Sequence, residues 1–193
     1  MLSLVNKAPV YYYPNFLSND EANFLFIELD SIDSTKHTHN DRLLARKTLV
    51  FGTDINQLAP KIWGDNVKIM PFLKFDKIDL VLNKVNLFLN QDYNVCLVNI
   101  YDTGKDFIGW HADNEEKGST LSIASVSLGA TRPFKFLLKS EEPEKKTVDL
   151  ENGSLLVMNH PCQDLYLHCL PKIKKIKEKR INLTFRKFHY NKN

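Results

Sequence analysis

The chain has 193 residues, of which 43% are hydrophobic and 25% are charged. This size and balance predict one globular domain, residues 1–193, with a single core. The net charge of +3 is too small to identify a nucleic-acid binder by itself. Three cysteines at irregular spacing exclude a disulfide framework, and no stretch approaches the roughly 20 apolar residues of a membrane helix.

The cysteine usage favours a reducing, intracellular compartment, and the first residues do not read as a charged-then-apolar leader. In a eukaryote this would be the nucleus, and otherwise the cytoplasm. We expect a monomer that does not associate with membranes.

Two helices are predicted in the first half of the chain. The segment 18–21 has the spacing of a capping box, and apolar residues follow at helical intervals over 19–30. The polar residues 30–41 then predict a loop, and 42–51 suit an extended segment. A second apolar stripe predicts a helix over about 76–90.

The second half of the chain alternates with a period of two, which is typical of strands. Short strands are predicted over 95–101, 121–128, 133–138, 147–150, 154–158 and 180–188. Asn152-Gly153, between two of them, predicts a hairpin turn. Helices followed by many short strands indicate an α+β fold, a double-stranded β-helix (jelly roll) with N-terminal helices packed on one sheet. A helical extension would then span about 1–91 and the jelly-roll core about 92–190.

One group of residues is typical of a metal site. His111 and Asp113 are two apart and can both bind one ion from a strand end, and His168 would complete a triad from across the barrel. Two histidines and one carboxylate hold Fe(II) on one face and leave the other positions open. His160 is an alternative second imidazole.

Polar residues also share one face of two predicted strands. Asn99 and Tyr101 point to the same side of the first strand. The last strand carries Arg180, Asn182, Thr184 and Arg186 on one face. Exposure to solvent is the commoner explanation of such alternation. The alternative is a buried site in which an arginine pairs with the carboxylate of a co-substrate.

The order of these motifs resembles the AlkB family of Fe(II)- and 2-oxoglutarate-dependent dioxygenases, particularly its eukaryotic DNA-repair branch. The resemblance covers about residues 46–188. The matching segments are Asn99-Ile-Tyr101, Ile108-Gly-Trp-His-Ala-Asp113, Ile123-Ala-Ser-Val-Ser-Leu-Gly129, Gly153-Ser-Leu-Leu-Val-Met-Asn-His-Pro161, His168-Cys-Leu-Pro171 and Arg180-Ile-Asn-Leu-Thr-Phe-Arg186.

The resemblance implies roles for these residues. The catalytic metal ligands would be His111, Asp113 and His168, holding Fe(II). Arg180 would bind the distal carboxylate of 2-oxoglutarate, assisted by Asn99 and Tyr101. That side of the pocket would be completed by Asn182, Thr184 and Arg186.

The resemblance also implies a nucleotide-recognition role for the extension before residue 92. Arg46, Asn114 and Glu115 fall at substrate-binding positions, although Asn114 departs from the acidic residue of the family. The paired aromatics that cover a flipped base in relatives have no clear counterpart here. Trp63, Trp110 and Phe51 are candidates to replace them.

The implied reaction uses Fe(II), 2-oxoglutarate and O₂, with ascorbate as the reductant in assays. It would remove N-alkyl lesions such as 1-methyladenine and 3-methylcytosine from DNA and release formaldehyde and succinate. A base inside a duplex must first be extruded, and five lysines between 172 and 179 are candidate phosphate contacts or a solvated basic loop.

Three alternatives remain open. RNA is a possible substrate of the same chemistry. A jelly roll that binds nucleic acid without catalysis and a hydroxylase of proteins or small molecules are the other two. If the metal assignment is right, we expect His111→Ala or Asp113→Ala to abolish turnover and to leave the fold largely intact.

Overall fold

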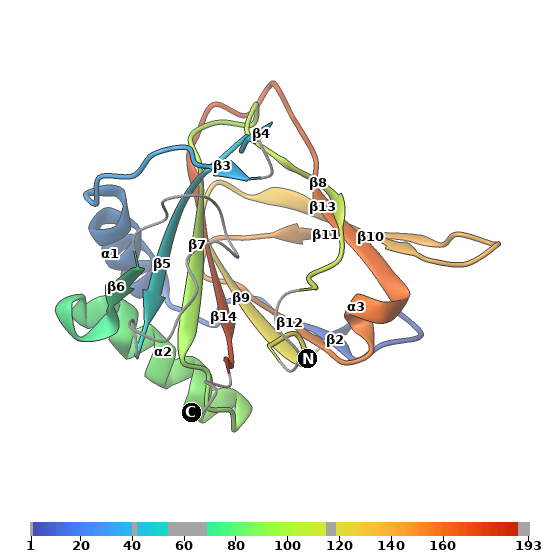
Figure 1. Ribbon diagram of the computed structural model, residues 1–193, viewed down its shortest axis with the longest axis horizontal. Helices are drawn as coiled ribbons and strands as arrows, with labels where there is room; N and C mark the ends of the chain where they lie inside the picture. The colour runs from blue at the N-terminus through green and yellow to red at the C-terminus, as the bar shows by residue number, and fades with distance from the viewer. Residues whose placement is uncertain (1, 40–41, 54–68, 115–118, 189–193) are drawn as a thin grey trace.

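Two β-sheets face each other in the computed structural model, which describes residues 2–39, 42–53, 69–114 and 119–188 (Figure 1). Helices α1 (Asn19–Asp30) and α2 (Asp76–Leu89) lie on one side of the larger sheet, and the smaller sheet lies on the other. This is the α+β jelly roll with packed N-terminal helices that the sequence predicted. Within these ranges, no helix is long and apolar enough to cross a membrane.

The larger sheet has eight described strands in the order β1-β2-β12-β9-β14-β7-β5-β6. All neighbours pair antiparallel except β5 and β6, which are parallel. The strands are β1 (Leu2–Ser3), β2 (Val10–Tyr13), β5 (Lys47–Gly52), β6 (Ile69–Pro71), β7 (Val95–Tyr101), β9 (Ser122–Gly129), β12 (Leu155–Asn159) and β14 (Arg180–Arg186). The segment before residue 92 therefore supplies four strands of this sheet as well as both long helices.

The smaller sheet has the strand order β11-β10-β13-β8. Its strands are β8 (Ile108–His111), β10 (Arg132–Leu138), β11 (Lys145–Leu150) and β13 (Tyr166–Leu170). The short elements are β3 (Thr38–His39), β4 (Arg42–Leu43), the 3-10 helix η2 (Phe72–Lys74) and α3 (Cys162–Leu165). Helix α3 leads directly into β13.

The central strands bury two chemically different faces. On the outer face, Val98 of β7 and Leu183 of β14 belong to the same buried cluster as Leu25 of α1 and Val85 of α2. Successive side chains of a strand alternate between its faces. The polar residues of β7 and β14 therefore point inward, between the two sheets.

The helices follow the predicted pattern closely. Ser18 Oγ accepts a hydrogen bond from the Glu21 amide (3.2 Å), and the Glu21 carboxylate accepts one from the Ser18 amide (2.7 Å). This reciprocal cap satisfies two amides that the first turn leaves unpaired. Helix α2 ends at Leu89, and Asn90 follows in the left-handed conformation (φ 50°).

Periodicity did not predict strands β1, β2, β6, β8 and β13, and β3 lies in the segment 30–41 that was predicted as a loop. Strand β8 reads Ile-Gly-Trp-His, and β13 has only five residues immediately after α3. Segments this short carry too little alternation to be distinguished from loops. The predicted hairpin at Asn152-Gly153 is wrong. A turn is present, with Gly153 at a φ of 75°, but β11 and β12, which it connects, lie in different sheets and do not pair.

Candidate active site

His111, Asp113 and His168 converge at the β8 edge of the smaller sheet. Their ligand atoms all lie within 4.8 Å of one another. Oδ1 of Asp113 lies 3.5 Å from Nε2 of His111 and 3.9 Å from Nε2 of His168. His168 does not approach from across the barrel, as the sequence suggested, because β13 pairs with β8 and places His168 directly opposite His111. The expected approach of His168 from across the barrel is therefore wrong, because the sequence did not predict the position of β13.

The two imidazoles are held in different ways. Nδ1 of His111 lies 2.9 Å from the Gly109 carbonyl, which can only accept, so Nδ1 carries a proton and Nε2 is the atom that faces Asp113. His168 is buried and stacks on Phe134, with ring centroids 5.3 Å apart. Burial lowers the pKa of His168 to about 3, although Asp113 opposes the shift.

Asp113 is held by contacts from two directions. Nη2 of Arg186 donates to Oδ2 of Asp113 (2.9 Å), and the Asp113 amide donates to the side-chain carbonyl of Gln163 (3.0 Å). Burial favours the neutral acid, but the attraction of the Arg186 guanidinium acts against it, and the pKa of Asp113 lies well below its usual range. The carboxylate is therefore ionised and oriented toward both histidines.

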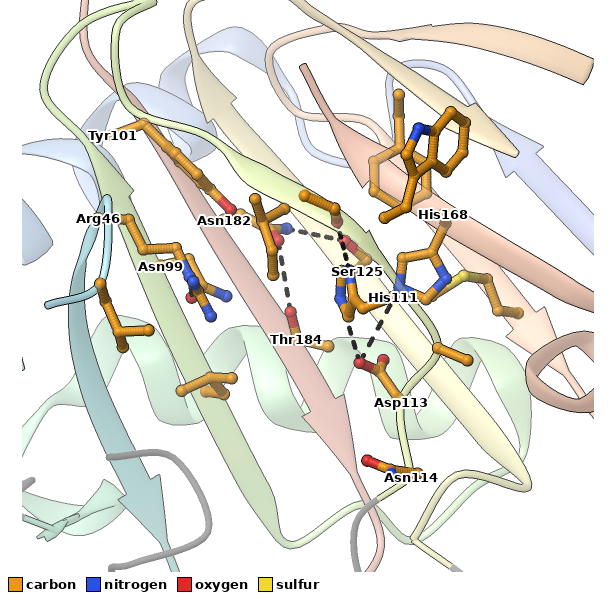
Figure 2. A pocket seen from close by; sticks show the side chains of 18 of the residues that line it. Arg46, Asn99, Tyr101, His111, Asp113, Asn114, Ser125, His168, Asn182 and Thr184 are labelled. Atoms are coloured by element: carbon orange, nitrogen blue, oxygen red, sulfur yellow. Dashed lines mark hydrogen bonds and ion pairs between the residues drawn. The ribbon is translucent and has the colours of Figure 1, made fainter. Parts of the chain in front are cut away.

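A cavity of about 380 Å³ opens beside these three residues (Figure 2). Its wall on the larger sheet is polar. That wall includes Asn99, Tyr101, Ser125, Asn182, Thr184 and Arg186. All six are buried, which excludes solvent exposure as the reason for the alternating polar residues.

The polar wall is cross-linked by its own side chains. The Asn182 amide donates to Ser125 Oγ (2.8 Å) and to the Val126 carbonyl (2.9 Å), and Thr184 Oγ1 donates to Asn182 Oδ1 (3.4 Å). Nε of Arg46 donates to Oδ1 of Asn99 (2.5 Å). Arg46, which was predicted to bind the substrate, therefore contacts Asn99, which was predicted to bind the co-substrate.

Arg180 lies behind the cavity wall. It does not line the cavity, but its Cζ lies 5.3 Å from the ring centroid of Tyr101, which does. Its Nη2 donates to Ser127 Oγ (2.9 Å). Burial lowers the pKa of Arg180 to about 10. The nearby positive charge of Arg132 also lowers this pKa, whereas Tyr101 raises it. Arg180 is still cationic at neutral pH.

Two of the three predicted substrate-binding residues line the cavity. Arg46 lines the cavity, as does the exposed Asn114, whereas Glu115 lies outside the described residues. The alternative ligand His160 is excluded from the triad, since its side chain is 62% exposed and contacts Asp164 (3.3 Å).

The structure also distinguishes among the three aromatic residues that were candidates to cover the base. Phe51 is fully buried in the core beside Phe72 and Phe75, and Trp63 lies in the part of the chain that is not described. Trp110 is 43% exposed and lines the cavity. Of these three, Trp110 is the aromatic that the structure places at the site.

Sequence reasoning missed four residues at or near the site: Ser125, Arg132, Phe134 and Gln163. Ser125 belongs to a matching motif and to the inward face of β9, so alternation along that strand was an available signal. Gln163 reaches Asp113 only because α3 packs beside β12. No local pattern predicts such a contact.

The residues present fit Fe(II) and 2-oxoglutarate. Two imidazoles and one carboxylate are a ligand set for this metal. Arg180 is 1% exposed, and its Nε has no hydrogen-bond partner among the described residues. A buried cation that donates to the neutral hydroxyl of Ser127 is well suited to a carboxylate.

A jelly roll with two histidines and an aspartate beside a buried polar cavity defines the class of mononuclear non-haem metal oxygenases. The family model of the 2OG-Fe(II) oxygenase superfamily matches residues 9–186. The chain belongs to this superfamily, and within it to the AlkB family that the sequence resembles.

Two relatives illustrate the similarity. DNA oxidative demethylase ALKBH2 of Bos taurus is 41% identical over 138 residues, which cover 67% of this chain and 46% of that protein. Alpha-ketoglutarate-dependent dioxygenase alkB homolog 3 of Rattus norvegicus is 38% identical over 104 residues, which cover 49% and 35%. The chain thus spans about half the length of the curated relatives it matches, or less.

Solved structures share the fold. The structure of OsALKBH1 has a TM-score of 0.63 at 22% identity and is matched over 95% of this chain and 100% of its own. A prolyl hydroxylase of Trichoplax adhaerens, in complex with a hypoxia inducible factor peptide fragment, has a TM-score of 0.63 at 12% identity over 94% of this chain and 84% of its own. At these identities the likeness concerns architecture alone.

Proposed function

We propose that the protein is an oxidative demethylase that removes N-alkyl lesions, such as 1-methyladenine and 3-methylcytosine, from DNA. The observation that carries the proposal is the convergence of His111, Asp113 and His168 beside a buried polar cavity. The DNA oxidative demethylases among the relatives support this choice of substrate.

Each part of the site has a task in this reaction. His111, Asp113 and His168 would hold Fe(II), and Arg180 with Tyr101 would hold the distal carboxylate of 2-oxoglutarate. When bound, these groups and O₂ supply an oxidative decarboxylation that hydroxylates the N-methyl group, so that succinate, CO₂, formaldehyde and the unmodified base are released. Arg186 keeps Asp113 ionised and oriented throughout.

The cavity mouth would receive the damaged base. The exposed Trp110 offers an aromatic surface on which a base can stack. Arg46 joins this side of the pocket to the co-substrate wall through its hydrogen bond to Asn99. The amide of Asn114 replaces an acidic residue, so it can both donate to and accept from the edge of a base.

The basic loop after β13 would contact the phosphates. The Gly104 amide donates to the Ile176 carbonyl (2.9 Å) and the Ile173 amide to the Gly104 carbonyl (2.7 Å), which fixes this loop against the turn before β8. Lys174 and Lys175 are exposed. Lys179 instead pairs with Asp30 and Asp102, so it contributes less to a free basic surface.

Mass spectrometry of methylated oligonucleotides tests the proposal. Single- and double-stranded DNA and RNA would be incubated with the protein, Fe(II), ascorbate and 2-oxoglutarate. We expect DNA carrying 1-methyladenine or 3-methylcytosine to lose the mass of one CH₂, with an equal amount of succinate formed. Loss from RNA alone would identify an RNA demethylase. Succinate formation with no change in any oligonucleotide would exclude these substrates, and no succinate at all would contradict the enzymatic assignment.

A further inference from the structure

Arg132, the first residue of β10, is a second fully buried guanidinium near the site. Its Nη2 donates to the carbonyls of Pro171 (2.7 Å) and Asp106 (3.1 Å), and its Nη1 to that of Thr103 (3.4 Å). All three partners are backbone groups without net charge. Its Nε has no hydrogen-bond partner in the described part of the chain.

Two buried cations therefore share one aromatic ring. Cζ of Arg132 lies 5.9 Å from the Tyr101 ring centroid, and Cζ of Arg180 lies 5.3 Å from it. Both guanidinium groups donate hydrogen bonds to neutral oxygens. The Asp106 carboxylate is the acid near Arg132, but Oδ1 of Asp106 already pairs with Lys36 (2.8 Å).

This arrangement is costly unless an anion joins it. Burying a charge is costly, and a second like charge adds to the cost. The Asp106 carboxylate offsets part of this cost for Arg132, but it is shared with Lys36. Burial lowers the pKa of Arg132 against the opposing effects of Tyr101 and Asp106, and it lowers the pKa of Arg180 as well. Tyr101 lines the cavity, so a carboxylate beside its ring would be attracted by both cations.

We propose that Arg132 is a specificity-determining residue, a second cation that makes the site prefer a co-substrate with a distal carboxylate. This inference rests on the proposed function, since it assumes that a 2-oxo acid binds with its far end toward Tyr101. Arg132 acts through the electric field around this ring. At the effective dielectric constant of about 20 that applies inside proteins, a charge several ångströms away changes binding by about tenfold or more.

A purely mechanical role makes a different prediction. Arg132 also ties the turn before β8 to the end of β13, the two strands that carry His111 and His168. If bracing were its whole role, its loss would weaken every 2-oxo acid equally. A co-substrate analogue without the distal charge separates the two roles.

The test is isothermal titration calorimetry of the Mn(II)-loaded protein with 2-oxoglutarate and with 2-oxopentanoate, which lacks the distal carboxylate. For Arg132→Gln we expect affinity for 2-oxoglutarate to fall by about tenfold or more, with 2-oxopentanoate changed by less than about twofold. Arg132→Lys keeps the charge and should keep the preference. Ser18→Ala, which removes the α1 cap far from the site, controls for lost stability.

Equal weakening of both ligands by Arg132→Gln, or an unchanged preference, would overturn the proposal. If the glutamine variant does not fold, Arg132→Lys decides alone: a retained preference supports the role of charge, and a lost one overturns it. A wild-type protein that binds neither acid would instead contradict the proposed function, so the two failures are distinguishable.

Discussion

Asp113 connects the metal site to the core at the level of single residues. It faces two imidazoles through one oxygen and Arg186 through the other. The sequence predicted that replacing either His111 or Asp113 would leave the fold intact. The structure separates the two cases, because the Asp113–Arg186 pair is buried whereas the His111 side chain is 30% exposed.

Asp113→Ala should therefore lose turnover and also stability. Removing one partner of a buried ion pair costs about 3 kcal/mol or more. His111→Ala should lose turnover with a loss of only about 1 kcal/mol, since it removes one partly exposed hydrogen bond. Urea unfolding measures both. Adding Arg186→Met to Asp113→Ala should restore stability, and no recovery would count against the buried pair as the cause.

His168 gives the metal-free protein a defined pH dependence. Its pKa is about 3 in the folded chain and about 6.5 when unfolded, so between these values only the unfolded chain binds the proton. Stability should fall as pH is lowered through this window. The depressed pKa of Asp113 acts in the same direction, because its contribution is lost as pH falls through the folded value.

Urea unfolding in the presence of a chelator, from about pH 7 to pH 4, measures this effect. The comparison is His168→Gln, which leaves the other titrating groups in place. We expect a shallower pH dependence in the variant, by up to about 1.4 kcal/mol per pH unit. Parallel curves for the two proteins would show that His168 is not buried as a neutral imidazole.

At the scale of elements, regular periodicity decided what was predictable. Strands β7 and β14 alternate over seven residues each, and their inward polar faces were found from sequence. Strand β13 is short and follows α3, so the approach of His168 was predicted from the wrong side. Arg132 gave no signal, because its hydrogen-bond partners are loop carbonyls that only the folded chain brings together.

The basic loop between β13 and β14 should supply phosphate contacts. Replacing Lys174 and Lys175 by alanine removes two exposed charges, and we expect weaker DNA binding with little sequence dependence. The slope of log affinity against log salt should decrease by about 1.8 for duplex DNA if both contact phosphates. Fluorescence anisotropy at several salt concentrations measures this slope.

Lys145→Ala with Lys146→Ala is a matched control, because it removes two charges from β11 in the hairpin at the far side of the smaller sheet (Figure 1). If both double variants lower the slope equally, the loop binds DNA no more specifically than the rest of the basic surface.

At the scale of the whole molecule, one sheet separates two environments. Its outer face is apolar and packs on the helices. Its inner face buries amides, hydroxyls and guanidinium groups around a cavity. Burying polar groups is favourable only when partners satisfy them, and side chains of this face supply part of these partners to one another. Alternating polar residues along a strand usually indicate a solvent-exposed face. Here they face the cavity between the sheets and indicate a site.

A crystal structure of the protein with Mn(II) and 2-oxoglutarate tests the account most directly. We expect one anomalous peak for the metal, bound by His111, Asp113 and His168, and the distal carboxylate beside Tyr101 and Arg180. A metal bound elsewhere, or a co-substrate whose distal carboxylate points to the cavity mouth, would contradict the site as described.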